Sequence, residues 1–316
     1  MKLKIDQQTI WLVGGVIGLL VLASIIGFVL ARMARSDAGK ATVKNLNART
    51  RAWWIMVAVF GLALATGGIG SVVLFGLTSF WALREFMTLT PSRAGDHRAL
   101  FWMFFAVTPL QYYLVGIQWY GLFSILIPVY AFLLLPIRTA VAGDCEQFLL
   151  RAANIQWGLM ICVYCVSYAP AILGLKISGY EGQNGKLLFW FVLVDQISDV
   201  FQYVWGKTLG KHKVAPTVSP NKTWEGLVGG LISATLVGGA LWWATPFNFW
   251  QAIGMSLAIT FMGFGGGLVM SAIKRDRGVK DYGSAIGGHG GVLDRIDSLC
   301  FAAPVFFHLT RFFFTD

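Results

Sequence analysis

Two acidic residues lie well inside one apolar stretch, residues 186–205, of this 316-residue sequence. Asp195 and Asp199 are four residues apart, so a helix places both on one face. Carboxylates at the depth of a membrane are costly and usually functional, and a bound cation removes that cost. The spacing therefore predicts a metal or ion site. A neutral Asp that hydrogen-bonds a neighbouring helix is the alternative.

A basic segment, residues 205–230, follows directly. Four lysines lie between Lys207 and Lys222, and two prolines prevent this part from being helical. Ser219 or Thr223 can cap the apolar helix that comes next, and a helix N-terminus with free N–H groups suits a phosphate. We therefore expect a phosphate site here. A basic loop with a simple helix cap is the alternative.

A second polar cluster occupies residues 271–297. Asp294 and Asp297 are three residues apart at the start of an apolar helix, a spacing that can hold a divalent cation while substrate phosphates complete the octahedron. Glycines surround His289, which can contact phosphate, transfer a proton or only hold the loop in shape. The cluster also contains Lys274, Arg275, Arg277 and Lys280. A divalent metal with basic side chains is the usual equipment for phosphoryl or nucleotidyl transfer.

Membrane helices must position these residues. Hydrophobic residues make up 56% of the sequence and charged residues 13%, which excludes a soluble globular enzyme and a disordered chain. A spanning helix needs about 20 apolar residues. The sequence predicts an all-α, polytopic integral membrane protein with about ten such helices. We expect them at residues 10–31, two within 53–86 on either side of a turn at 65–70, 99–114, 118–137, 152–174, 187–206, 226–244, 249–270 and 298–313.

Basic residues orient the expected helices. If residues 32–51 form a cytoplasmic loop, alternation places 20 of the 25 Lys and Arg residues on that side. Both polar clusters then lie on the cytoplasmic face of a bacterial-type inner membrane. The net charge of +10 reflects these loops, so no nucleic acid partner is expected. Residues 1–50 look like an appended helix with a basic loop, and residues 51–316 like the catalytic membrane domain.

A glycine-rich run, residues 263–267, lies in the middle of an expected span. Small residues let membrane helices approach closely, so we interpret this run as helix packing rather than a nucleotide loop. Glycines on helix faces also permit a homodimer.

The segment 271–297 resembles the signature of the phosphatidate cytidylyltransferases (CDP-diacylglycerol synthases). The matching residues are Ser271, Lys274-Arg275, Lys280-Asp281, Gly283, His289-Gly290-Gly291 and Asp294-Arg295-Ile296-Asp297. The segment 198–226 is similar to the family's stretch that ends in Ser-Pro-x-Lys-Thr-Trp-Glu-Gly, and Arg84-Glu85-Phe86 to a weaker feature. The resemblance covers roughly residues 50–316.

The resemblance implies that CTP and phosphatidate react to give CDP-diacylglycerol and pyrophosphate, with Mg²⁺ and, as an option, a second cation. The residues it assigns to the metal are Asp199, Asp294 and Asp297. Those it assigns to the nucleotide phosphates are Ser219, Lys222 and Thr223. Those it assigns to neutralising phosphate charge are Lys207, Lys274, Arg275 and Lys280. Catalysis is then mostly positioning and charge neutralisation.

Two departures from the family pattern keep alternatives open. Val200 and Phe201 follow Asp199, where small residues are usual, and Gly287-Gly288 stand where Pro-Gly is usual. Bulk beside Asp199 can reshape the lipid pocket. The alternatives are CTP-dependent transfer to another lipid phosphate, an inactive paralogue, and an ion-coupled carrier.

Overall fold

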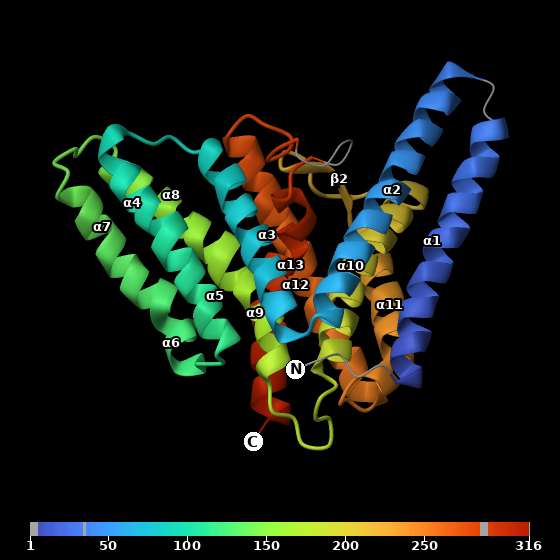
Figure 1. Cartoon of the computed structure of the whole chain (residues 1–316). Helices are drawn as coiled ribbons and strands as arrows, with labels where there is room; N and C mark the ends of the chain where they lie inside the picture. The colour runs from blue at the N-terminus through green and yellow to red at the C-terminus, as the bar shows by residue number, and fades with distance from the viewer. Residues whose placement is uncertain (1–5, 34–35, 285–289, 316) are drawn as a thin grey trace.

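The computed structural model describes residues 6–33, 36–284 and 290–315 (Figure 1). The predicted site residue His289 and the Gly287-Gly288 departure lie outside these described residues. Continuous long helices are α1 (Gln7–Met33), α2 (Asp37–Ala65), α3 (Gly68–Thr88), α10 (Asn184–Thr208), α12 (Phe249–Asp276) and α13 (Leu293–Phe314). The shorter α11 (Trp224–Ala240) and η6 (Trp242–Ala244) connect α10 to α12.

Three further helical rods contain wider turns where the regular hydrogen-bond ladder changes. The first joins η1 (Ala94–Asp96), α4 (His97–Trp102), η2 (Met103–Val107) and α5 (Thr108–Gly116). The second joins α6 (Tyr120–Ile125), η3 (Leu126–Ala131) and α7 (Phe132–Ala140). The third joins α8 (Phe148–Leu159), η4 (Met160–Cys165), α9 (Val166–Ala171) and η5 (Ile172–Gly174). Each rod contains a proline in or just after the wide turn, and proline cannot donate to the ladder.

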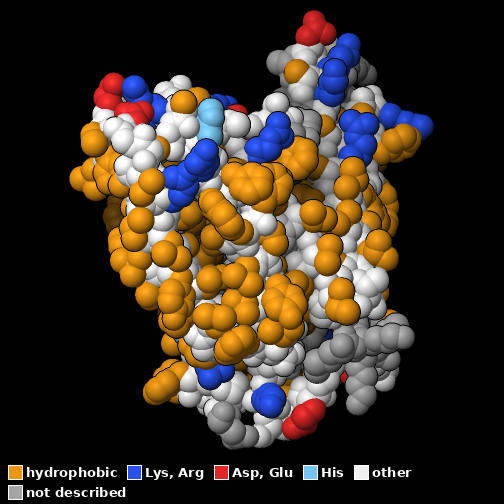
Figure 2. Space-filling view, turned by 60° about the vertical axis from the view of Figure 1, so that its left-hand side comes forward, with side chains coloured by type: hydrophobic (Ala, Val, Ile, Leu, Met, Phe, Trp, Pro, Cys, Tyr) orange, Lys and Arg blue, Asp and Glu red, His pale blue; other side chains and the backbone are white. Residues whose placement is uncertain are grey.

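The prediction of an all-α polytopic membrane protein is confirmed. Within the described residues, nine helices or rods are long and apolar enough to cross a membrane, and they coincide with the expected spans. The remaining expected span corresponds to α11, which has 17 residues. On the face drawn in Figure 2, hydrophobic side chains form a broad band, and most of the Lys and Arg side chains lie at its upper edge.

The basic segment 32–51, which we expected to be a loop, is largely helical. Ser36 caps α2, because its Oγ accepts a hydrogen bond from the backbone N–H of Gly39 at 3.1 Å, and Asp37 occupies the first turn. From there to Ala65 the sequence contains no proline, so the helix continues from the basic segment into the apolar one. The expected division at residue 50 falls inside α2 and stays a prediction.

The helices form a central group with two flanks (Figure 1). In the centre, α10, α12 and α13 pack on one another, and α13 also packs on α3 and α9. Phe191 of α10 stacks on Phe306 of α13 with ring centroids 4.9 Å apart. The α1–α2 hairpin lies on one flank and α4 to α7 on the other. The core therefore surrounds α13, the helix that carries Asp294 and Asp297.

A buried ion pair fastens the start of α1 to α10. The Nζ of Lys186, whose side chain is 2% exposed, donates to Oδ2 of Asp6 and to Oε1 of Gln8, each at 2.6 Å. This contact joins residues 180 positions apart. The expected appendage is thus tied to the helix that carries Asp195 and Asp199.

Lys186→Met is expected to lower the free energy of unfolding by about 1–3 kcal/mol, because Asp6 and Gln8 lose their donor while the side-chain volume is kept. Thermal unfolding in detergent measures the effect. Lys176→Met is the matched control, since Lys176 is exposed on the same side of the bundle. Equal midpoints for the two variants contradict the prediction.

Candidate functional site

The predicted site residues lie at one end of the central helix group. The C-terminal end of α10, the C-terminal half of α12 and the N-terminus of α13 meet there. A two-stranded antiparallel sheet lies beside them, in which β1 (Lys213–Ala215) pairs with β2 (Ser219–Thr223). Figure 1 places β2 at the same end as the start of α13. The proline-containing segment is therefore non-helical, as predicted, and it forms a hairpin.

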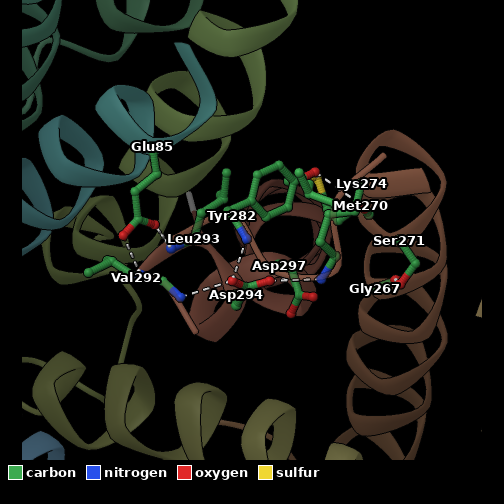
Figure 3. A network of polar contacts seen from close by, with 12 residues as sticks. Glu85, Gly267, Met270, Ser271, Lys274, Tyr282, Val292, Leu293, Asp294 and Asp297 are labelled. Atoms are coloured by element: carbon green, nitrogen blue, oxygen red, sulfur yellow. Dashed lines mark hydrogen bonds and ion pairs between the residues drawn. The ribbon is translucent and has the colours of Figure 1, made fainter. Parts of the chain in front are cut away.

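Asp294 holds the loop before α13 in place (Figure 3). Its Oδ1 accepts from Nζ of Lys274 at 2.8 Å, and its Oδ2 accepts from the backbone N–H groups of Tyr282 at 2.8 Å and Gly291 at 2.9 Å. Lys274 reaches this carboxylate from the last turns of α12 and is itself buried. Both oxygens of Asp294 therefore already have protein donors. Its predicted role as a metal ligand stays a prediction.

Glu85 is the functional-site residue that the sequence analysis did not select. It comes from α3, is 7% exposed, and accepts hydrogen bonds from Val292 N at 3.0 Å and Leu293 N at 2.8 Å. These are among the free N–H groups at the N-terminus of α13, where a negative charge is favourable. A Cβ at Gly291 would lie 2.3 Å from Oε2 of Glu85, so only glycine fits there. In the sequence, the only indication of a role for Glu85 was the similarity of Arg84-Glu85-Phe86 to a feature of the family.

Glu85→Gln is expected to lower the free energy of unfolding by about 1.5–3 kcal/mol, because an amide loses the charge and turns a donor toward one of the two N–H groups. Thermal unfolding in detergent is the measurement. Glu146→Gln is the control, since that side chain is 64% exposed. An unchanged midpoint for Glu85→Gln would argue against its capping role.

Carboxylates from α10 and α13 meet around Ser298. The Ser298 hydroxyl donates to Oδ2 of Asp195 at 3.0 Å, and its backbone N–H donates to Oδ1 of Asp297 at 3.0 Å. Asp199, one helical turn after Asp195, is close enough for the negative charge of Asp297 to act on it. Asp195 is completely buried, Asp297 is half-buried and Asp199 is exposed. Asp199 and Asp297 are therefore the carboxylates that a bound ligand can reach, whereas Asp195 is buried.

Lys222 brings a positive charge to these carboxylates. Its Nζ donates to the carbonyl oxygen of Phe264 at 3.3 Å and lies 4.6 Å from the centre of that ring. Burial lowers the pKa of Lys222, and the negative charges of Asp199 and Asp297 act in the opposite direction. A basic residue held this way can neutralise a phosphate bound next to the carboxylates.

The glycine-rich run of α12 makes this approach possible. A Cβ at Gly267 would lie 2.7 Å from Nζ of Lys222, and one at Gly263 would lie 2.9 Å from Oδ1 of Asp195. A Cβ at Gly266 would lie 2.7 Å from the carbonyl oxygen of Asp297. The interpretation of this run as close packing is confirmed, and the packing partners are the site residues themselves.

Thr223 is the N-cap of α11, since its Oγ1 accepts from Gly226 N at 3.1 Å. The hairpin is fastened by Glu225, whose carboxylate accepts from the backbone N–H groups of Lys211 and His212 and lies 2.6 Å from Nδ1 of His212. Ser219, at the start of β2, is half-buried. Thr223 therefore caps the N-terminus of α11, which is one of the two caps that the sequence predicted.

The other predicted phosphate-binding cations are exposed: Lys207, Arg275 and Lys280. Lys207 Nζ lies 3.3 Å from the Tyr203 hydroxyl. Arg275 donates to the carbonyl oxygens of Val218 at 3.3 Å and Val279 at 3.0 Å, which links α12 to the hairpin. The structure therefore brings Lys222 and Lys274 to the carboxylates and leaves Lys207, Arg275 and Lys280 exposed.

The described residues contain no group of three or more His, Cys, Asp or Glu side chains that could hold a metal ion. The donor chemistry nevertheless fits a hard cation, because Asp199 and Asp297 supply carboxylate oxygens. Oδ1 of Asp195 is buried and lacks a hydrogen-bond partner within the described part of the chain. Mg²⁺ commonly binds through one or two carboxylates and substrate phosphates. The metal site stays a prediction.

Fold and site together define a polytopic membrane protein in which paired carboxylates and lysines meet at one end of the helix bundle. A profile of the cytidylyltransferase family matches residues 47–313. The chain belongs to this family, which confirms the resemblance found in the sequence.

Individual relatives extend this finding. An uncharacterized protein of Escherichia coli (strain K12), YnbB, is 41% identical and aligns over 93% of this chain and 95% of its own length. A phosphatidate cytidylyltransferase of Staphylococcus aureus (strain COL) is 43% identical over 38% of this chain and 46% of the relative. One of Staphylococcus saprophyticus is 42% identical over 46% of this chain and 56% of the relative. The chain thus aligns with about half the length of these named enzymes.

Proposed function

We propose that this protein is an integral-membrane phosphatidate cytidylyltransferase. In the reaction, a phosphate oxygen of phosphatidate attacks the α-phosphorus of CTP, the bond to the β-phosphate breaks, and CDP-diacylglycerol and pyrophosphate form. The observation that carries the proposal is the contact of Lys222 with the glycine-rich face of α12, within reach of the charges of Asp199 and Asp297. Family membership and the named relatives support the choice of CTP and a lipid phosphate.

Each residue has a distinct expected task. Lys222 binds nucleotide phosphates, and Asp199 and Asp297 are the residues that would hold Mg²⁺. When bound, Mg²⁺ supplies positive charge to the triphosphate. Asp294 keeps Lys274 and the preceding loop in position through its three hydrogen bonds. The rate acceleration is then expected from positioning and charge neutralisation.

The orientation in the membrane is part of the proposal. Lys and Arg concentrate at the end of the molecule that carries the site, above the hydrophobic band (Figure 2). Basic residues favour the cytoplasmic side. We therefore assign the active site to the cytoplasmic face of a bacterial-type inner membrane, where CTP is available. A homodimer is compatible with the exposed apolar helix faces.

Nucleotide transfer in detergent tests the proposal. Purified protein receives CTP labelled in its α-phosphate, Mg²⁺ and phosphatidate, and label is followed into the lipid phase. We expect label that requires phosphatidate and Mg²⁺. Lipid-phase label that is independent of phosphatidate, or complete absence of transfer with every lipid phosphate, contradicts it.

A second candidate is CTP-dependent transfer to a different lipid phosphate. Val200, directly after Asp199, is 46% exposed and is bulkier than the small residues usual at this position in the family. A set of acceptors with one phosphate and different chains separates the two candidates. A preference for another acceptor that reverts to phosphatidate in Val200→Gly identifies this position as the cause.

A further inference from the structure

A groove between α1 and α2 has a volume of about 600 Å³, and none of the residues assigned to the transfer site lines it. It is lined by residues of both helices: Ser24, Phe28, Ala31, Lys40, Val43, Lys44, Asn47, Thr50, Arg51 and Trp54. Most of these residues precede residue 47, where the family match begins. The groove is therefore largely a feature of the N-terminal helical hairpin.

Side-chain contacts close the inner end of this groove. Nε1 of Trp54 donates to Oγ of Ser24 at 3.1 Å. One turn or two farther out, Nδ2 of Asn47 donates to the carbonyl oxygen of Gly27 at 3.4 Å, and a Cβ at Gly27 would lie 2.0 Å from Oδ1 of Asn47. The two helices are thus in close contact at these levels. Their packing gives the groove a defined shape.

The charged side chains of the groove are basic and can contact a ligand. Lys40, Lys44 and Arg51 line it and are exposed. Lys40 has an exposed pair with Asp37 at 3.8 Å, whereas no acidic partner of Lys44 or Arg51 occurs in the described part of the chain. Lys44 and Arg51 are seven residues apart, close to two helical turns, so both face the groove.

Cationic and apolar side chains lie next to one another along α2. Lys40 and Lys44 lie near the end that faces the hairpin connection, and Trp54 lies about 15 Å deeper than Lys44 at 1.5 Å per residue. Phe28 and Val43 add apolar surface to the walls. The outer flank of α1 exposes further apolar side chains, including Leu22, Ile25 and Val29. Arg51 lies only three residues before Trp54, so cationic side chains extend along the groove next to its apolar walls. This combination matches a molecule that carries both a phosphate and an acyl chain.

We propose that the α1–α2 groove binds one acidic glycerophospholipid through its headgroup phosphate. Lys44 and Arg51 contact the phosphate, and an acyl chain lies beyond Arg51 along Trp54. A phosphate monoester such as phosphatidate and a diester such as phosphatidylglycerol share this chemistry. The proposal does not depend on cytidylyl transfer, because none of the groove residues belongs to the transfer site.

Native mass spectrometry of the full-length, detergent-purified chain tests lipid retention. The probes are dioleoyl phosphatidylglycerol, dioleoyl phosphatidate, dioleoyl phosphatidylcholine and inorganic phosphate. We expect wild-type protein to retain one phosphatidylglycerol at concentrations where phosphatidylcholine is lost. The double variant Lys44→Gln/Arg51→Gln should need at least a tenfold higher lipid concentration. The diester is the cleaner probe, because phosphatidate is also expected at the transfer site.

Two further variants separate charge from shape. Val43→Trp fills the groove without changing charge and should weaken retention similarly. Arg98→Gln is the matched control, since Arg98 is an exposed cation on α4, on the opposite flank, and it should not change retention. Thermal unfolding of each variant shows whether the fold is kept.

Comparison of the lipid probes shows which kind of molecule supplies the phosphate that the groove binds. Retention of phosphatidate but not phosphatidylglycerol, lost in the double variant, supports a site for the monoester; equal retention of both supports a general acidic-lipid site. Equal phosphatidylglycerol retention by wild type and a folded double variant overturns the proposal. Equal retention of phosphatidylcholine, or saturation by inorganic phosphate without lipid, also overturns it.

Discussion

Asp297→Asn is expected to reduce label transfer from CTP to lipid by about 10³-fold or more, while the protein still inserts and folds. The amide removes a negative charge beside Asp199 and Lys222, where we propose that a cation and the nucleotide phosphates bind. We expect the loss of this charge to destabilise the transition state. We therefore expect the fall mainly in kcat, measured with saturating CTP and phosphatidate.

Asp276→Asn is the matched control for this substitution. Asp276 lies at the end of α12 with a side chain that is 70% exposed, and it pairs with the neighbouring Arg277 at 3.3 Å. Its variant should keep wild-type activity. Near-normal turnover of a folded Asp297→Asn protein would remove Asp297 from the transfer site. A metal-binding titration by calorimetry, without substrate turnover, should show weaker Mg²⁺ binding for Asp297→Asn alone.

Lys222→Met is expected to raise the KM for CTP by about 10–100-fold, because one charge-assisted hydrogen bond to phosphate is lost. Methionine keeps the unbranched shape that fits beside Phe264 and Gly267, so packing should change little. Initial rates at varied CTP concentration, with saturating lipid, measure the effect.

Lys213→Met controls for a general loss of positive charge. Lys213 lies in the paired strand of the same hairpin, and its side chain is exposed. We expect its KM for CTP to stay within about twofold of wild type, since an exposed charge contributes little. If both lysine variants change the KM for CTP equally, the effect comes from the overall positive charge of the hairpin and not from a contact of Lys222.

The correct predictions from sequence are those that depend on local pattern. Apolar runs of sufficient length determine the spans, and the prolines exclude a helix before Thr223. The error at residues 32–51 has a local cause as well. Basic residues were taken as a loop signal, although lysine, alanine and leucine are good helix formers and Ser36 supplies a cap.

Glu85 illustrates what a local pattern cannot reveal. Its contacts with Val292 and Leu293 join residues more than 200 positions apart, so no spacing rule predicts them. The motif around Glu85 was visible, but its task depends on α3 lying against the start of α13. The same holds for Asp294, whose two oxygens are occupied by donors from α12 and the loop before α13.

The amino-acid sequence by itself determined the membrane-spanning architecture, the two polar clusters and the family to which the chain belongs. These follow from hydrophobic length, charge and motif order, which are properties of the linear chain. Only the tertiary structure decided that Lys222 crosses the glycine face of α12, that Glu85 caps α13 and that α1 and α2 enclose a basic groove. Each of these depends on how closely separate helices pack, because side-chain volume and hydrogen bonding between distant segments set the approach.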